Sequence, residues 1–99
     1  MAAVYRLKGE VVLWPGMQGA WHFVHVDKAN SAKIRKAHGA SKRGFGAVKV
    51  KATIGETSWT TSIFPDSKSG SYALPLKASV RRAESLAAGD PVAFTLTLA

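Results

Sequence analysis

The sequence predicts a mainly β domain, a small closed or split β-barrel of about six strands with two short helices. Three observations lead to this fold class. Most of the expected strands alternate apolar and polar residues with a period of two. Two segments change to a helical period, and short turns between strands favour antiparallel pairing around one core. With 99 residues, the whole chain (1–99) is expected to form one domain.

Six strands are expected, at residues 4–14, 20–26, 47–54, 57–64, 71–76 and 92–98. In the first, Tyr5, Leu7, Val11 and Leu13 share one face, and Arg6, Lys8 and Glu10 share the other. In the second, Trp21, Phe23 and His25 share a face. Gly55 and Glu56 form the two-residue turn of the hairpin between the third and fourth strands.

Helices are expected at residues 27–38 and 78–86. Asp27 or Asn30 is the candidate cap of the first helix, and Gly39 follows its end. Two similar sequence blocks surround these helices when gaps are allowed. Residues 24–26, 34–37 and 46–48 match residues 74–76, 80–83 and 89–92. This internal similarity adds the expectation of pseudo-two-fold symmetry.

The positive charge is concentrated in one segment. The chain carries a net charge of +8, and residues 28–51 contain eight basic residues and no acid, whereas six basic and six acidic residues balance elsewhere. Such a segment generates a local positive potential that attracts polyanions. The absence of cysteine excludes disulfides and thiolate zinc sites and fits a reducing compartment. No signal-peptide core or membrane-length apolar run occurs, so a cytoplasmic protein without membrane contact is expected.

Motifs for catalysis are missing from the sequence. His22, His25 and His38 have no nearby acid or thiol at metal-ligand spacing. Residues 39–44 have the glycine spacing of a phosphate loop but lack the Lys-Ser/Thr that should follow. No catalytic residue, metal or cofactor is therefore assigned, and a binding module is favoured over an enzyme.

The basic segment is the first candidate site. Long side chains on a helix, a loop and one strand face can reach phosphates of nucleic acid or another polyanion; they are Lys33, Arg35, Lys36, Lys42, Arg43, Lys49 and Lys51. Only one aromatic residue, Phe45, lies within the segment, which gives little support for base stacking. The alternative is a solvated basic surface without a partner.

A second candidate is a pocket for a small ligand or a protein partner. It would combine the hydroxyl groups of Thr60 and Ser62 with the rings of Trp59 and Tyr72. The alternation in the strand expected at residues 57–64 leaves another possibility open, in which Trp59 and Ile63 belong to the core.

The chain also resembles a known family. The resemblance rests on residues 59–65, 72–77, 80–82 and 89–90, together with Gly19, Trp21, Phe23 and Val24 upstream. These motifs are similar to those of DUF1905, a family of domains of unknown function, which suggests a bacterial protein. The family is in turn similar to split β-barrel proteins of the AbrB and MazE kind, some of which bind DNA as swapped dimers. The resemblance implies the barrel fold and a monomer or homodimer, and it carries over no catalytic residue.

Overall fold

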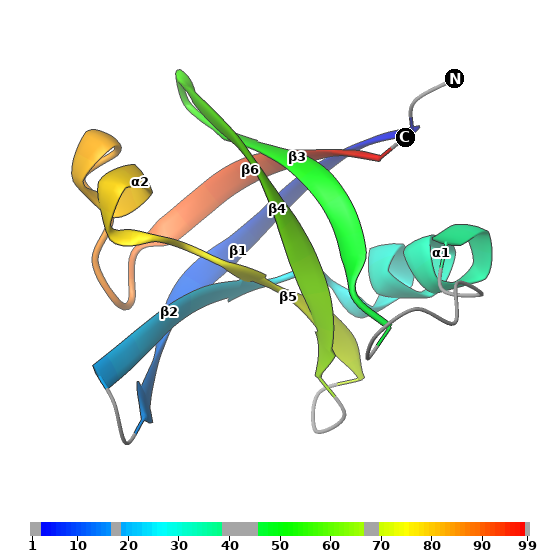
Figure 1. The fold of residues 1–99 in the computed structure, drawn as a ribbon, viewed down its shortest axis with the longest axis horizontal. Helices are drawn as coiled ribbons and strands as arrows, with labels where there is room; N and C mark the ends of the chain where they lie inside the picture. The colour runs from blue at the N-terminus through cyan, green and yellow to red at the C-terminus, as the bar shows by residue number, and fades with distance from the viewer. Residues whose placement is uncertain (1–2, 17–18, 39–45, 67–69, 99) are drawn as a thin grey trace.

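The computed structural model describes residues 3–16, 19–38, 46–66 and 70–98, and within them six strands form one closed antiparallel barrel (Figure 1). The ring order is β1-β2-β5-β4-β3-β6. The elements along the chain are β1 (Ala3–Gly16), β2 (Gly19–His25), α1 (Lys28–His38), β3 (Val48–Ile54), β4 (Thr57–Asp66), β5 (Ser71–Pro75), α2 (Ala78–Ala83) and β6 (Pro91–Leu98). The predicted fold class, a closed mainly β barrel with two short helices, is confirmed.

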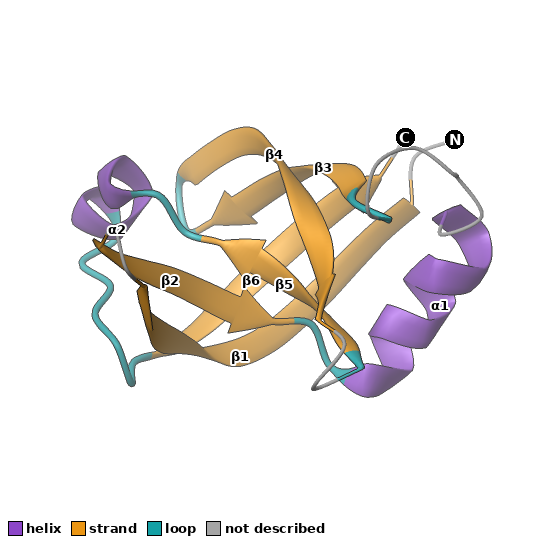
Figure 2. Ribbon diagram, turned by 60° about the horizontal axis from the view of Figure 1, so that its bottom comes forward, coloured by secondary structure: helices purple, strands orange, loops and turns teal. Residues whose placement is uncertain are grey.

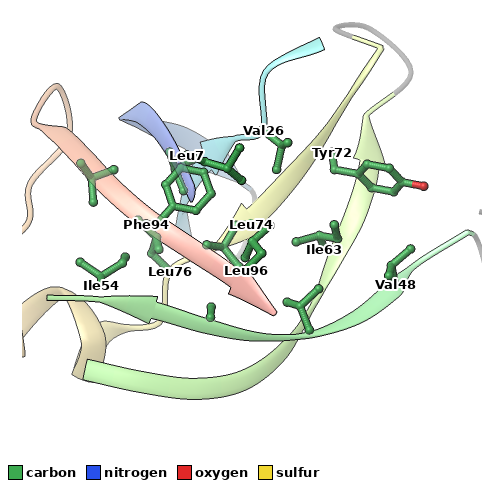
Figure 3. Packing of buried hydrophobic residues seen from close by; sticks show 14 of the residues in the cluster. Leu7, Val26, Val48, Ile54, Ile63, Tyr72, Leu74, Leu76, Phe94 and Leu96 are labelled. Carbon is green, nitrogen blue, oxygen red and sulfur yellow. The ribbon is translucent and has the colours of Figure 1, made fainter. Parts of the chain in front are cut away.

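The interior of the barrel is filled by the apolar positions of the alternating strands. In β3, Val48, Val50, Ala52 and Ile54 are buried, and the residues between them face outward. Side chains from all six strands meet in this core, and Figure 3 shows Leu74, Ile63 and Leu96 close together at its centre. Because the interior is packed with side chains, the open binding surfaces lie on the outside of the barrel.

The longest strand, β1, is shared between two neighbours. Residues 3–10 pair with β6, and residues 11–16 pair with β2. Gly9 lies at the change of partner, where an added Cβ would come 2.6 Å from Val24 Cγ2 and 3.2 Å from the His25 carbonyl oxygen. A residue without a side chain is therefore needed where β1 crosses so close to β2.

The barrel has the predicted pseudo-two-fold symmetry in its hydrogen bonding. Exchanging β1, β2 and β3 with β4, β5 and β6 leaves the ring order unchanged. The Val26 amide donates to the Tyr72 carbonyl at 2.9 Å, and the Leu76 amide donates to the His22 carbonyl at 2.8 Å. These two bonds are equivalent under a shift of 50 residues, and the helices also begin 50 residues apart. The sequence comparison paired residues 34–37 with 80–83, so its helix match was four residues out of the structural register.

The two helices lie at opposite ends of the barrel (Figure 2). Helix α1 begins after Asp27, whose carboxylate accepts hydrogen bonds from the Asn30 amide at 2.7 Å and the Asn30 side chain at 2.8 Å. Asp27 is therefore the cap, as one of the two expected candidates. Ser31 joins this helix to the sheet, because its hydroxyl accepts from the Tyr72 amide at 3.0 Å and donates to the Val26 carbonyl at 3.2 Å.

The second helix ends earlier than predicted, at Ala83 instead of residue 86. Ser85 adopts a left-handed conformation with φ of 54°. The Leu86 amide then donates to the Arg81 carbonyl at 2.9 Å and the Ser85 amide to the Arg82 carbonyl at 3.4 Å. This pattern is a Schellman cap, in which glycine is the usual residue. A serine in that position gave no sequence signal for the end of the helix.

Candidate functional site

The predicted basic residues fall into two exposed groups. Lys33, Arg35 and Lys36 lie on α1, and Lys49 and Lys51 lie on the outer face of β3. The other two candidates, Lys42 and Arg43, lie outside the described residues. The described cations are therefore exposed to solvent, but they form two separate groups, one on helix α1 at the end of the barrel and one on strand β3.

Arg35 is the cation of α1 that is fixed in place. Its Nη2 donates to the Gly70 carbonyl at 3.3 Å, and its guanidinium carbon lies 5.8 Å from the centroid of the Tyr72 ring. Gly70 directly precedes β5. These contacts hold one positive charge beside the start of that strand while leaving the side chain exposed.

On the barrel wall, lysines and hydroxyls alternate across two strands. Lys49 pairs with Ser62 and Lys51 pairs with Thr60 in the β3–β4 register. All four side chains point outward, because the residues between them on β3 are buried. Cations and hydroxyl donors are both groups that contact phosphate oxygens.

The four residues of the predicted pocket do not come together. Tyr72 is 2% exposed and lies in the core, and Trp59 packs against the core from the inner face of β4. Thr60 and Ser62 lie on the opposite, outer face of that strand. This separation follows from the period of two along a strand, which turns neighbours to opposite faces. Thr60 and Ser62 therefore belong with the lysines, not with the two rings.

An apolar groove instead lies on the outer face of β1, β2, β5 and β4. We call it the aromatic groove; its walls are Trp14, Trp21, Phe23, Phe64 and Pro75. It has a volume of about 510 Å³. An adjoining hollow of about 270 Å³ shares Trp14, Phe23 and Phe64 and adds His25, Asp66 and Ala73. Together they form an extended surface that sequence reasoning did not identify.

The strand register explains how the aromatic groove forms. Trp14 faces Trp21 across β1 and β2, Phe23 faces Pro75 across β2 and β5, and Phe64 faces Ala73 across β4 and β5. Ala73 is small and only 8% exposed, since the larger rings stand around it. Ala73 therefore forms a low floor, and the larger side chains around it form the walls of the groove.

The rings of the groove are both exposed and ordered relative to one another. Trp21 is 59%, Trp14 48% and Phe64 45% exposed, which is unusual for such large apolar side chains. Trp21 and Phe23 are stacked with an interplanar angle of 12°, and Trp14 meets Phe23 edge-on at 71°, both at centroid distances of 6.3 Å. Exposed apolar surface gathered into one patch is typical of a binding site.

One end of the groove carries a polar pair. His25 Nε2 lies 3.2 Å from Asp66 Oδ2, and the two side chains are 34% and 19% exposed. This pair is placed by the β2–β5–β4 register, in which Ala73 is opposite both His25 and Phe64. It gives an otherwise apolar surface a hydrogen-bonding end.

Several cations lie on the elements around the groove. Arg35 is held next to the start of β5. Lys49 pairs with Ser62, which lies two residues before Phe64 on the same face of β4. Beyond the other end of β5, the Leu76 amide donates to the His22 carbonyl, and the exposed Lys77 is the next residue along the chain.

The sequence did contain part of the signal for this site. Trp21, Phe23 and His25 were placed on one strand face, and Trp14 falls on the charged face of the first strand. Phe64 falls on the same face as Thr60 and Ser62. What was missing was the position of β5 between β2 and β4, which brings these faces into one surface.

The described part of the chain offers no cluster of three or more His, Cys, Asp or Glu side chains suited to a metal ion. The Nδ1 atom of His22 is buried and has no hydrogen-bond partner among the described residues. Burial, and then the charge of Arg81, lower the pKa of His22 below its usual value. No helix among the described residues is long and apolar enough to cross a membrane.

The family model described as "Domain of unknown function (DUF1905)" matches residues 8–96. No curated protein matches the chain. The similarity to AbrB and MazE proteins therefore stays a prediction.

Proposed function

The chain belongs to the DUF1905 family, and from this premise we propose that it is a module that binds single-stranded nucleic acid on the outer face of its barrel. Bases would stack in the aromatic groove, and phosphates would contact the cations that border it. The proposal keeps the basic segment as the source of phosphate contacts and adds the stacking surface that the sequence alone did not supply.

The exposed rings are the observation that carries this proposal. Trp14, Trp21 and Phe64 offer ring surface to solvent from β1, β2 and β4, and Phe23 lines the same groove. Stacking of a base on an aromatic side chain contributes about 1–3 kcal/mol per base and tolerates any sequence, because every base has a flat apolar face. A curved sheet with aromatic residues on its outer surface is a recurrent way to hold unpaired bases.

The charge distribution supports a polyanion over a neutral partner. The chain has a net charge of +8, and Arg35, Lys49 and Lys77 stand around the groove. A backbone that runs over the rings would have cations within reach on both sides. Lys51, Thr60 and Ser62 extend the same surface along β3 and β4. Lys33 and Lys36 add exposed charge on α1.

The second candidate function is binding of a small ligand or a protein partner. The residues first considered for it, Trp59, Thr60, Ser62 and Tyr72, lie on opposite faces of the barrel wall, so the aromatic groove is the better place for it. Aromatic grooves also accept proline-rich segments in extended conformation. The basic surroundings favour nucleic acid, and the same experiment separates the two.

The test measures anisotropy of a labelled single-stranded 12-mer, as DNA and as RNA, at salt concentrations between 50 and 200 mM. Trp21→Ala and Phe64→Ala should each weaken binding by roughly 5- to 150-fold, which corresponds to one lost stacking contact of about 1–3 kcal/mol. The double variant Lys49→Gln/Lys51→Gln should reduce the slope of log K against log salt by about 1.4, or about 0.7 for each phosphate contact.

Two controls make this experiment decisive. Val4→Ala removes an exposed apolar side chain outside the groove, and Arg82→Gln removes an exposed charge on α2. Neither should change affinity by more than about twofold. The proposal would be wrong if the wild-type protein did not bind the oligonucleotides. It would also be wrong if Trp21→Ala and Phe64→Ala bound them as tightly as Val4→Ala does. If the protein bound a labelled proline-rich decapeptide and not the oligonucleotides, the groove would be assigned to a protein partner.

A further inference from the structure

A second hollow lies on the opposite side of the barrel from the aromatic groove. The groove is centred on the seam between β2 and β5. The β3–β6 seam is diametrically across the ring (Figure 1), and the second hollow spans β1, β6 and β3 on that side. Its volume is about 340 Å³. The polar side chains that line it are Arg6, Lys8, Thr53 and Thr95, and the rest of its lining is Leu7, Gly55, Ala93 and Phe94.

The register shows why a hollow forms at this position. Arg6 is opposite Thr95, and Thr95 is opposite Thr53, so one row across β1, β6 and β3 carries a cation and two hydroxyls. In the next row Lys8 is opposite Ala93. Gly55 ends β3 in the left-handed conformation with φ of 57° and has no side chain. Small residues in the second row leave space that the larger residues enclose.

The polar side chains around this space are all hydrogen-bond donors. Arg6 and Lys8 are two residues apart on one exposed strand face. Within the described part of the chain neither cation is engaged in an ion pair. Thr53 Oγ1 lies 2.9 Å from Ser58 Oγ, and either hydroxyl can donate to the other and leave one proton to offer outward.

No acidic residue is among those that line the hollow, although acids lie close to it. Glu84 lies directly beside Gly55 and accepts a hydrogen bond of 2.6 Å from Thr57 Oγ1. Glu10 follows Lys8 by two residues on the exposed face of β1. The lining itself therefore carries two positive charges and no acid, in contrast to the His25–Asp66 end of the aromatic groove.

From this arrangement we propose that the β3–β6 hollow is an oxyanion site that takes a phosphate group. Arginine presents a planar fork that matches two phosphate oxygens, lysine adds a point charge, and threonine hydroxyls complete the shell. The phosphate can belong to a small phosphorylated molecule or to a nucleic-acid strand that continues around the barrel. The site does not depend on the aromatic groove, because the two share no residue.

The test is a titration with inorganic phosphate, followed in ¹⁵N–¹H spectra at pH 7 and constant ionic strength, with chloride as the balancing ion. Phosphate should shift the amides of Thr53, Thr95 and their neighbours in a saturable way. The double variant Arg6→Gln/Lys8→Gln should weaken phosphate binding by at least about tenfold, since two charge-assisted contacts are lost. The control Lys28→Gln/Arg82→Gln removes the same charge from exposed positions on the two helices and should leave the affinity unchanged.

Equal weakening by both double variants, or shifts spread evenly over all exposed lysines, would overturn the site, because either result means general attraction of anions. A second arm adds the single-stranded 12-mer and identifies the source of the phosphate. Competition with inorganic phosphate at Thr95 would assign the site to a strand that wraps the barrel. Independent binding of both would assign it to a small phosphorylated molecule. A spectrum of each variant that matches the wild type away from the substitution confirms that the barrel is folded.

Discussion

Ser31 ties α1 to the barrel, and its replacement by alanine is expected to destabilise the protein measurably. The side chain is 0% exposed. Its hydroxyl accepts a hydrogen bond from the Tyr72 amide at 3.0 Å and donates one to the Val26 carbonyl at 3.2 Å. Alanine removes both contacts without changing the backbone. The buried amide of Tyr72 is then left without its partner.

The size of the effect follows from two opposing contributions. A buried donor that loses its partner costs about 1–3 kcal/mol. Alanine is a better helix former than serine, and this difference raises the free energy of unfolding by roughly 0.5 kcal/mol. The net loss in free energy of unfolding should be about 0.5–2.5 kcal/mol. For a domain of this length, the melting temperature should fall by roughly 2–20 °C.

Urea and thermal denaturation followed by circular dichroism measure this loss. Ser79→Ala is the matched control, since Ser79 is an exposed residue of α2, and it should change stability by less than about 0.5 kcal/mol. Hydrogen exchange of the Tyr72 amide adds a local readout and should accelerate more than that of its neighbours. The reasoning would be refuted by a Ser31→Ala protein as stable as the wild type with Tyr72 still protected.

Two further predictions concern titrating groups. Hydrogen bonds from Asn30 lower the pKa of Asp27 below its usual value of 3.8, so the capped carboxylate stabilises the fold above that pH and the contribution is lost as the pH falls through the lowered pKa. Asp27→Ala should therefore cost about 1 kcal/mol at pH 7 in urea titrations, and an equal cost at pH 3 would contradict this origin. Burial and then Arg81 lower the pKa of His22 below 6.5, so the fold favours the neutral ring and loses stability as the pH drops from that value toward the lowered pKa. His22→Gln should flatten the wild-type loss of stability between pH 7 and 5, and an unchanged slope would assign that loss to other groups.

The strands and their faces could be predicted because their information is local. The alternation in residues 48–54 assigned four side chains to the core and two lysines to the surface, and the structure has both. The end of α2 could not be predicted, because Ser85 occupies a left-handed position where glycine is the usual signal. Its conformation is set by the cap that the surrounding backbone forms.

The site could be predicted only in fragments, for a different physical reason. Which residues share a strand face is a property of a few neighbours in sequence. Which strands lie side by side depends on pairings between segments far apart in the chain, such as Phe64 with Ala73 in β4 and β5 and Phe23 with Pro75 in β2 and β5. The aromatic groove needs four strands in a particular order, and the local pattern specifies none of those neighbours.

The departure from pseudo-symmetry at one position explains the depth of the aromatic groove. Under the 50-residue shift, Phe23 is equivalent to Ala73 and His25 to Pro75, and all four face outward on the β2–β5 seam. If the two halves were identical here, two phenylalanines would flank the axis and the floor between Trp14 and Phe64 would be filled. Alanine at position 73, where the equivalent residue is Phe23, keeps the floor low, and the backbone hydrogen bonds of the two halves are equivalent. The repeated scaffold thus positions the strands, and the differences between its halves create the binding surface.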